Sequence, residues 1–277
     1  MKRSLSVFLL SVVLCMLLAA CGGTPTPAGN TSTPTSAATP IALNVFAAAS
    51  LTESFNQIAS TYHQMHPSIT IKPNYNGSQI LEQQIANAAP SDVFASADLT
   101  NMQKASNAGL VDASQVFVKN RLVVIIPLSN PGHITSLKDL EKQGVKIDLE
   151  ASTVPAGNYS RQALANLSKS ADYGSGYASA VLANVVSQED NVKAVVQKVQ
   201  LGEVDAGFVY RTDVTAAVAN KLSEIDIPDP YNVIAQYPIA VVKSSPHASD
   251  AQAFVDFVLS KAGQDIMQKY NFIPVNA

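Results

Sequence analysis

Two serines stand where a predicted strand passes into a predicted helix. Ser50 follows the apolar run 43–47 and precedes apolar positions with helical spacing, and Ser78 follows Gly77 between a second apolar run, 69–73, and a second helical pattern. The first amides of a helix have no intrahelical partner and lie at the positive end of the helix dipole, so such a junction can bind an anion. Each serine hydroxyl would add a further donor.

A purely structural role is the alternative for both serines, because serine is also a preferred helix N-cap. Glu53 lies three residues after Ser50, which is the spacing of a capping box. On this segment alone, both interpretations remain open. Two serines at successive junctions favour the anion site, because both helix starts would lie at one edge of a parallel sheet and their donors could converge.

Two more helix starts with free backbone donors are predicted in the second half of the chain. Pro155 has no N–H to lose at a first helical position, and the small Ala156 and Gly157 leave the neighbouring amides accessible. Asp190 or Asn191 is the expected cap of a helix that begins next to Val192, for which an ordinary capped helix is the alternative.

Tyr210 ends a predicted strand and is a candidate hydroxyl donor, although a tyrosine at such a place also serves packing. Arg211 is the only Arg or Lys in the candidate segments. Dicarboxylates and amino acids usually need such a cation in their site, so its scarcity favours a compact inorganic dianion. Sulfate, or an organic acid bound through Arg211, remains the alternative ligand.

The elements that must position these residues alternate between strand and helix, which predicts an α/β fold with a parallel sheet. The predicted helix of the first unit after Ser78 covers 78–88. Further strands are predicted at 92–95, 122–127, 206–210 and 237–242, and further helices at 137–140, 155–167, 191–201 and 250–270.

Two lobes are expected, because one α/β unit is followed by another and then by a closing helix. Lobe one is predicted to contain residues 41–120 and 243–277, and lobe two residues 121–242. The cleft between two lobes is a usual place for a small ligand.

The N-terminus predicts export. Lys2 and Arg3 precede the apolar run 7–18, and the small residues before Cys21 resemble a bacterial lipobox, so 1–20 is a predicted signal peptide and Cys21 the lipidated residue. Residues 21–40, which carry no charge and are rich in Thr and Pro, form a predicted flexible linker. We therefore expect a protein anchored to the outer face of the cytoplasmic membrane or located in the periplasm.

Composition argues against several classes of function. The formal charge of −3, which loss of the signal peptide would move to −5, and the lack of a basic run argue against nucleic-acid binding. Cys15 and Cys21 are the only cysteines, so no thiol is left for a disulfide, a zinc site or a nucleophile. His63 and His66 share a predicted helix without a third ligand nearby. We expect neither an enzyme nor a metal-cation site, because catalytic motifs such as G-x-S-x-G are also absent from the sequence.

The order of these motifs resembles the periplasmic molybdate-binding proteins of ABC importers, which have the type II solute-binding fold, over nearly all of 41–277. The matching segments are 47–52 (AAASLT), the turn at Ser78, 89–98, 154–157 (VPAG), 189–192, 209–210, 237–242 and 270–272. Residues 148–153 depart from the family by lacking a Gly-Asp-Pro-type approach.

The resemblance implies a site, a ligand and a partner. In that family two serines, two backbone amides and a tyrosine hydroxyl bind the oxyanion, and no charged side chain or metal-cation ligand touches it. The corresponding residues here are Ser50, Ser78, Ala156, Val192 and Tyr210. The implied ligand is molybdate or tungstate, with no further cofactor. The implied partners are the permease subunits of an ABC importer, and we expect the protein itself to be a monomer.

Overall fold

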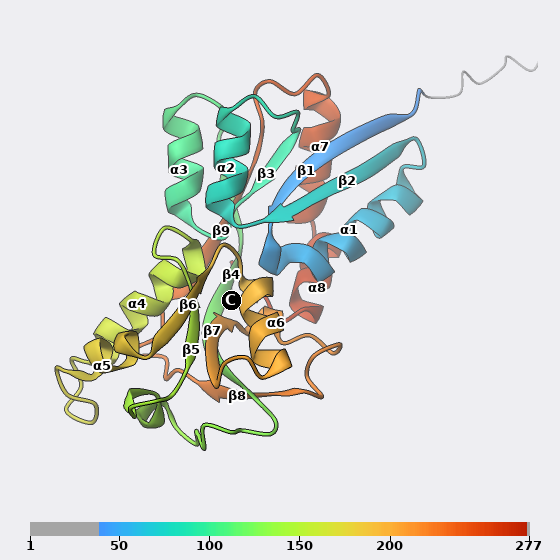
Figure 1. Cartoon of the computed structure of the whole chain (residues 1–277). Helices are drawn as coiled ribbons and strands as arrows, with labels where there is room; N and C mark the ends of the chain where they lie inside the picture. The colour runs from blue at the N-terminus through green and yellow to red at the C-terminus, as the bar shows by residue number, and fades with distance from the viewer. Residues whose placement is uncertain (1–38, 276–277) are drawn as a thin grey trace, which may run out of the picture. The chain divides into compact units, whose positions relative to one another are not determined.

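The first unit of the chain is built around β1 (Ile41–Ala48), in a computed structural model that describes residues 39–275 (Figure 1). β2 (Ile69–Asn76) and β3 (Val93–Ala95) flank β1 and run parallel to it. The helices α1 (Thr52–Met65) and α2 (Ser78–Ala86) connect these strands, which confirms the predicted β-α-β-α-β order. The predicted signal peptide, Cys21 and most of the predicted linker lie outside the described residues.

Two long strands join this unit to the rest of the fold. β4 (Gln115–Pro127) pairs antiparallel with β9 (Ile234–Val241) through its first half, up to Arg121. Its second half, from Leu122 onward, pairs antiparallel with β7 (Ala206–Tyr210) and β8 (Leu222–Asp226). β9 also pairs antiparallel with β3. The resulting strand order is β2-β1-β3-β9-β4-β7-β5-β6. The change of partners along β4 falls between Arg121 and Leu122, one residue after the predicted boundary 120/121. However, β9, which the prediction assigns to lobe two, pairs with β3 of the first unit, and the lobe limits stay a prediction.

The second unit repeats the α/β pattern. β5 (Ile147–Glu150) lies between β6 (Val185–Glu189) and β7 (Ala206–Tyr210) and is parallel to both. Its helices are α4 (Pro155–Leu167), with the bounds that the sequence predicts, α5 (Tyr177–Ala183) and α6 (Val192–Leu201). The remaining elements are α3 (Leu99–Asn107), β8 (Leu222–Asp226) and the 3-10 turns η1 (Ala49–Leu51), η2 (Leu137–Glu141) and η3 (Arg211–Asp213).

The predicted closing helix 250–270 is wrong in one respect, because it consists of two helices. α7 (Ala248–Leu259) ends before Ser260, whose backbone is extended with ψ at 163°, and α8 (Lys261–Lys269) follows. The Ser260 hydroxyl accepts a hydrogen bond from the Gly263 amide at 3.3 Å and so caps α8. After α8, β10 (Ile273–Pro274) pairs with β4.

The C-terminal helices pack against α1. The ring of Phe254 on α7 meets Phe55 and Tyr62 of α1 edge to face, with centroids 6.4 and 5.3 Å apart. All three side chains are buried, which follows from the apolar face that the helical spacing predicts for both elements. The end of the chain therefore stabilises the helix that follows Ser50.

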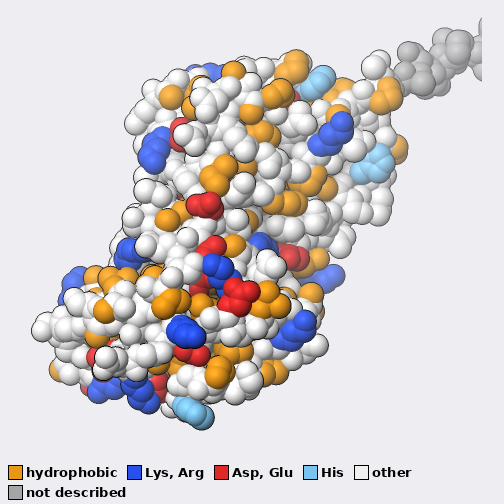
Figure 2. Space-filling model, in the orientation of Figure 1, with side chains coloured by type: hydrophobic (Ala, Val, Ile, Leu, Met, Phe, Trp, Pro, Cys, Tyr) orange, Lys and Arg blue, Asp and Glu red, His pale blue; other side chains and the backbone are white. Residues whose placement is uncertain are grey.

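Features of other protein classes do not occur in this fold. Within residues 39–275, no helix has the length and hydropathy needed to cross a membrane, and no group of three or more His, Cys, Asp or Glu side chains could hold a metal ion. On the face shown in Figure 2, blue Lys and Arg side chains lie interspersed with red Asp and Glu side chains.

Candidate functional site

Four of the five predicted site residues line one hollow, where the ends of β1, β5 and β7 face the starts of α2, α4 and α6. Ser50, Ser78, Val192 and Tyr210 belong to its lining, and Pro155, the neighbour of the fifth predicted residue Ala156, also does. The rest of the lining is Ala48, Ala49, Asn76, Gly77, Ala97, Glu150 and Asn191. The sequence pattern therefore identified the segments that meet here, although they lie far apart in the chain.

The hollow is small and closely walled. Its cavity volume is about 10 Å³, close to the minimum that holds one water molecule. A Cβ on Gly77 would lie 2.1 Å from the carbonyl oxygen of Asp190, so only glycine permits the turn before α2 to approach the segment before α6 this closely. Gln79 reinforces the contact by donating from Nε2 to the same carbonyl at 3.0 Å.

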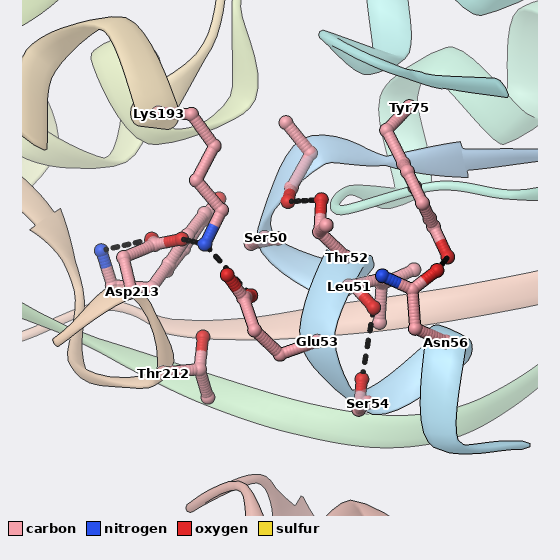
Figure 3. A network of polar contacts seen from close by, with 12 residues as sticks. Ser50, Leu51, Thr52, Glu53, Ser54, Asn56, Tyr75, Lys193, Thr212 and Asp213 are labelled. Carbon is pink, nitrogen blue, oxygen red and sulfur yellow. Dashed lines mark hydrogen bonds and ion pairs between the residues drawn. The ribbon is translucent and has the colours of Figure 1, made fainter. Parts of the chain in front are cut away.

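Ser50 does not cap α1, so the structural interpretation of this serine as half of a capping box is wrong. It lies in η1, the first turn before α1, and the N-cap position of α1 is Leu51 without a side-chain hydrogen bond. The Ser50 hydroxyl, which is buried, lies instead 2.9 Å from the hydroxyl of Tyr237 on β9. The side chain of Glu53 is turned to Lys193, as Figure 3 shows.

The partners of Tyr237 favour one direction for this hydrogen bond. Asn120, a fully buried residue of β4, donates from Nδ2 to the Tyr237 oxygen at 3.3 Å and to the Thr212 oxygen at 2.8 Å. Because an amide nitrogen only donates, the Tyr237 proton is free to be donated to Ser50 Oγ. The Ser50 proton is then left for a group in the hollow.

Ser78 is oriented in the same sense by a different partner. It is the first residue of α2, after the N-cap Gly77, and its side chain makes no capping hydrogen bond. Its buried hydroxyl oxygen accepts a hydrogen bond from the amide of Ala97 at 2.9 Å. A hydroxyl that accepts from a backbone N–H keeps its own proton for donation.

The starts of α4 and α6 supply backbone donors. The N-cap of α4 is Val154, which makes no side-chain hydrogen bond, and the carboxyl of Glu150 accepts from the Gly157 amide at 3.1 Å instead. Asn191 caps α6 as predicted, by accepting from the amide of Ala194 at 3.2 Å, and this leaves the Val192 amide outside the cap. Both helices have 10 or more residues and so carry a full dipole.

Tyr210 brings a hydroxyl group that lacks a partner within the described part of the chain. Its side chain is 1% exposed, and within residues 39–275 its oxygen makes no hydrogen bond of good geometry, although the Tyr237 hydroxyl lies near it. Burial is the main reason why the pKa of Tyr210 lies well above its ordinary value, so this phenol is a neutral donor. Buried hydroxyls are normally hydrogen-bonded, and one that faces a hollow without a partner suggests that the partner is a ligand.

No lysine or arginine lines the hollow. The guanidinium of Arg211 pairs with Asp226 and, at 3.5 Å, with Glu224. Lys193, on α6, contacts Glu53 of α1 at 2.8 Å and the buried Asp213 at 3.4 Å (Figure 3). The cations close to the site are thus paired with carboxylates, and donation to an anion falls to hydroxyl and amide groups.

Sequence reasoning missed three residues of this region. Glu150 lines the hollow, and Asn120 and Tyr237 orient Ser50 from behind it. The departure of residues 148–153 from the family pattern was a signal for Glu150. Nothing in the sequence indicates Asn120, because its partners are brought together only by the pairing of β4 with β9 and β7.

Comparison with known sequences relates the chain to bacterial solute-binding proteins. The sequence profile of the family described as bacterial extracellular solute-binding protein matches residues 43–273. The chain is 34% identical over 269 residues, 97% of each sequence, to the molybdate-binding protein ModA of Mycobacterium tuberculosis. It is 29% identical over 278 residues, 98% of this chain and 99% of the relative, to the Bacillus subtilis protein named "Putative ABC transporter substrate-binding lipoprotein YvgL".

A solved structure supports the fold. The periplasmic molybdate-binding protein of Azotobacter vinelandii superposes with a TM-score of 0.71 at 21% identity, over 83% of this chain and 98% of that chain. At this level of identity the likeness concerns the fold alone. Because the family profile covers most of the sequence, the chain belongs to the family of bacterial extracellular solute-binding proteins and has their two-lobed α/β fold.

Proposed function

We propose that this protein captures molybdate or tungstate outside the cytoplasm and delivers it to the permease of an ABC importer. The observation that carries the proposal is the unpartnered, buried Tyr210 hydroxyl in a hollow that also contains Ser50 and Ser78. The names of the mycobacterial and Bacillus relatives, which mention molybdate and an ABC transporter, agree with it. The family description, bacterial extracellular solute-binding protein, also agrees with a binding role.

The proposed site binds a dianion through several converging dipoles. Ser50, Ser78 and Tyr210 each have a hydroxyl proton available, and the amides of Ala156 and Val192 lie at the starts of α4 and α6. Hydrogen bonds to a charged acceptor are roughly twice as strong as neutral ones, and helix N-termini add the positive end of their dipoles. Such a set can replace a counter-ion.

The dimensions and the charges favour this ligand class over an organic acid. A hollow of about 10 Å³ is far smaller than the pockets of ~300–1,000 Å³ that hold extended organic ligands, which argues against an extended carbon skeleton. Arg211, the one residue that could have clamped a carboxylate, is already paired with Asp226 and Glu224. Sulfate has the same shape and charge as molybdate and remains the second candidate.

The proposed localisation follows from the N-terminal sequence. Lipidation at Cys21 would attach the protein to a membrane through the linker that precedes β1, and the lipoprotein name of the Bacillus relative agrees with this. The proposed working form is a monomer.

Isothermal titration calorimetry on the full chain in detergent micelles tests the proposal. We expect one site for molybdate and for tungstate, and much weaker binding of sulfate. Equal affinity for the three ions would remove the claim of specificity and keep an oxyanion site. Binding of a dicarboxylate in preference to all three would contradict the proposal.

A further inference from the structure

Glu150 is a carboxyl group in the lining of a hollow that otherwise offers hydrogen-bond donors. It ends β5, and its side chain is 3% exposed. Its Oε2 accepts a hydrogen bond from the amide of Gly157 at 3.1 Å, and the amide of Ala156 also donates to this carboxyl. Glu150 therefore binds the first amides of α4, one of which is a proposed ligand donor.

The groups around Glu150 do not neutralise it. Asp213 in η3 and Asp98 before α3 both raise its pKa by like-charge repulsion, and Tyr210 on β7 is close enough to be affected by its charge. On the neighbouring strand, Glu189 is paired with Lys198. In α4, Arg161 donates to the backbone oxygen of Glu150 and not to its carboxylate.

Lys193 is another cation near the site, and it is paired with carboxylates other than Glu150. It pairs with Glu53 and Asp213 and does not line the hollow. An ionised Glu150 would thus have only amide dipoles to stabilise it. Burial is the main reason why the pKa of Glu150 is raised, to about 8. An incoming dianion would place two further negative charges next to it.

We propose that the dianion and the ionised Glu150 exclude each other, so that Glu150 is protonated whenever the oxyanion is bound. This inference rests on the proposed function of the site. The proton comes from solvent: the carboxylate, one proton and the dianion combine to give a neutral carboxylic acid beside the bound ion, and no bond of the ligand changes. In this state Glu150 can donate its own O–H, and the amides of Ala156 and Gly157 are no longer needed to stabilise a carboxylate.

The proposal makes oxyanion binding dependent on pH in one direction. Below about pH 8 Glu150 already carries its proton, and binding needs no proton uptake. Above that pH each binding event takes up one proton, and the affinity falls by about tenfold per pH unit. The bound oxyanion would thus be released at alkaline pH, although the oxyanion itself does not change its protonation state.

Calorimetric titration of the full chain with molybdate, in a pH series from about 6.5 to about 9.5 where the ion itself does not titrate, tests this linkage. At each pH two buffers with different ionisation enthalpies report the number of protons taken up. We expect this number to rise from near zero to near one across the series as the dissociation constant increases. Glu150→Gln, which keeps the size and stays neutral, should bind over the whole series with uptake near zero.

Asp148→Asn is the matched control. Asp148 is a buried carboxyl on the same strand whose pKa burial raises to about 7, but it does not line the hollow. This variant should keep the wild-type pH dependence of binding, which separates an effect of the hollow from a general effect of buried carboxyls.

The outcomes separate this inference from the proposed function. Absence of molybdate binding at every pH would contradict the proposed function. Tight binding with no proton uptake in the wild type, or wild-type uptake in Glu150→Gln, would contradict the role of Glu150. If Glu150→Gln does not fold, as its circular dichroism would show, the proton count of the wild type alone decides, because a value near zero above about pH 8 overturns the proposal.

Discussion

The hydroxyl of Tyr237 lies 2.9 Å from the hydroxyl of Ser50, and the amide of Asn120 donates to Tyr237 from the other side at 3.3 Å. Because the Asn120 amide nitrogen only donates, Tyr237 keeps its own proton and can donate it to Ser50 Oγ. In that arrangement the Ser50 proton is available to the hollow, and the two residues that orient Ser50 do not line it.

Tyr237→Phe tests this orientation. We expect molybdate affinity to fall by about 5- to 10-fold, because Ser50 Oγ loses the donor that orients it and a typical buried hydrogen bond contributes about 1 kcal/mol. The measurement is calorimetry, with thermal unfolding measured in parallel. Tyr75→Phe is the control, since the Tyr75 hydroxyl donates an exposed hydrogen bond to Asn56 Oδ1 and Tyr75 does not line the hollow. An unchanged affinity for Tyr237→Phe would show that Ser50 does not need this partner.

The three hydroxyls of the site should each contribute on their own. A hydrogen bond to a charged group is worth about 1.5–3 kcal/mol, so Ser50→Ala, Ser78→Ala and Tyr210→Phe should each weaken binding by about 10- to 150-fold.

Arg211→Ala serves as the comparison for these variants, because its guanidinium is paired with Asp226 and Glu224. It should bind molybdate nearly as well as the wild type. Loss of binding in Arg211→Ala together with normal binding in both serine variants would instead favour an arginine-bound carboxylate.

The backbone donors need a different kind of substitution. Ala156→Pro and Val192→Pro each delete an N–H group near a helix start, a place where proline is compatible with the helix. Each should lower affinity at least as much as a hydroxyl deletion. Ala156→Ser retains the amide and should bind far better than Ala156→Pro in the same titration. Equal binding by the two Ala156 variants would exclude this amide from the site.

The sequence predicted the parts of the site that depend on local signals. Neighbouring residues alone determine the strand-to-helix junctions, the proline at the start of α4 and the Asn191 cap. These elements form as expected. The sequence also suggested that Ser50 would cap its helix with Glu53. Contacts with Tyr237 and Lys193, which are distant in the chain, override that local pattern.

The missed features have two different physical causes. β4 was predicted only from residue 122 onward, because its first half, which contains Lys119 and Asn120, has no simple apolar pattern. The pairing of β4 with β9 buries Asn120 regardless, and its amide is satisfied by Tyr237 and Thr212. The break at Ser260 was hidden for the opposite reason, because the apolar pattern continues across it.

The predicted lipid anchor can be tested independently of the site. Cys21→Ser should move the protein from the membrane fraction to the soluble exported fraction, because a thiol is needed to carry the lipid and Cys21 is the only cysteine beyond the predicted signal peptide. Fractionation followed by immunoblotting measures this, and molybdate affinity should remain at the wild-type value. A variant that stays with the membranes would show that another segment attaches the protein.

Stability in the absence of ligand should decrease as the pH rises from about 5 to about 8. Burial raises the pKa of Asp213 to about 6, of Asp148 to about 7 and of Glu150 to about 8, above the values that these carboxyls have in an unfolded chain. Between the unfolded and the folded pKa the native state holds more protons than the unfolded state. The free energy of unfolding therefore falls with increasing pH across this window and levels off above the highest folded pKa.

Thermal unfolding measured at intervals of pH follows this change, which we expect to amount to a few kcal/mol or roughly 5 °C or more in melting temperature. Glu150→Gln and Asp148→Asn should each flatten the profile, since each removes one proton-binding group of the native state. Glu82→Gln is the control, because Glu82 is not a buried residue of the core. A melting temperature that rises between about pH 5 and about pH 8 would mean that these carboxyls are ionised in the native protein, against the effect of their burial.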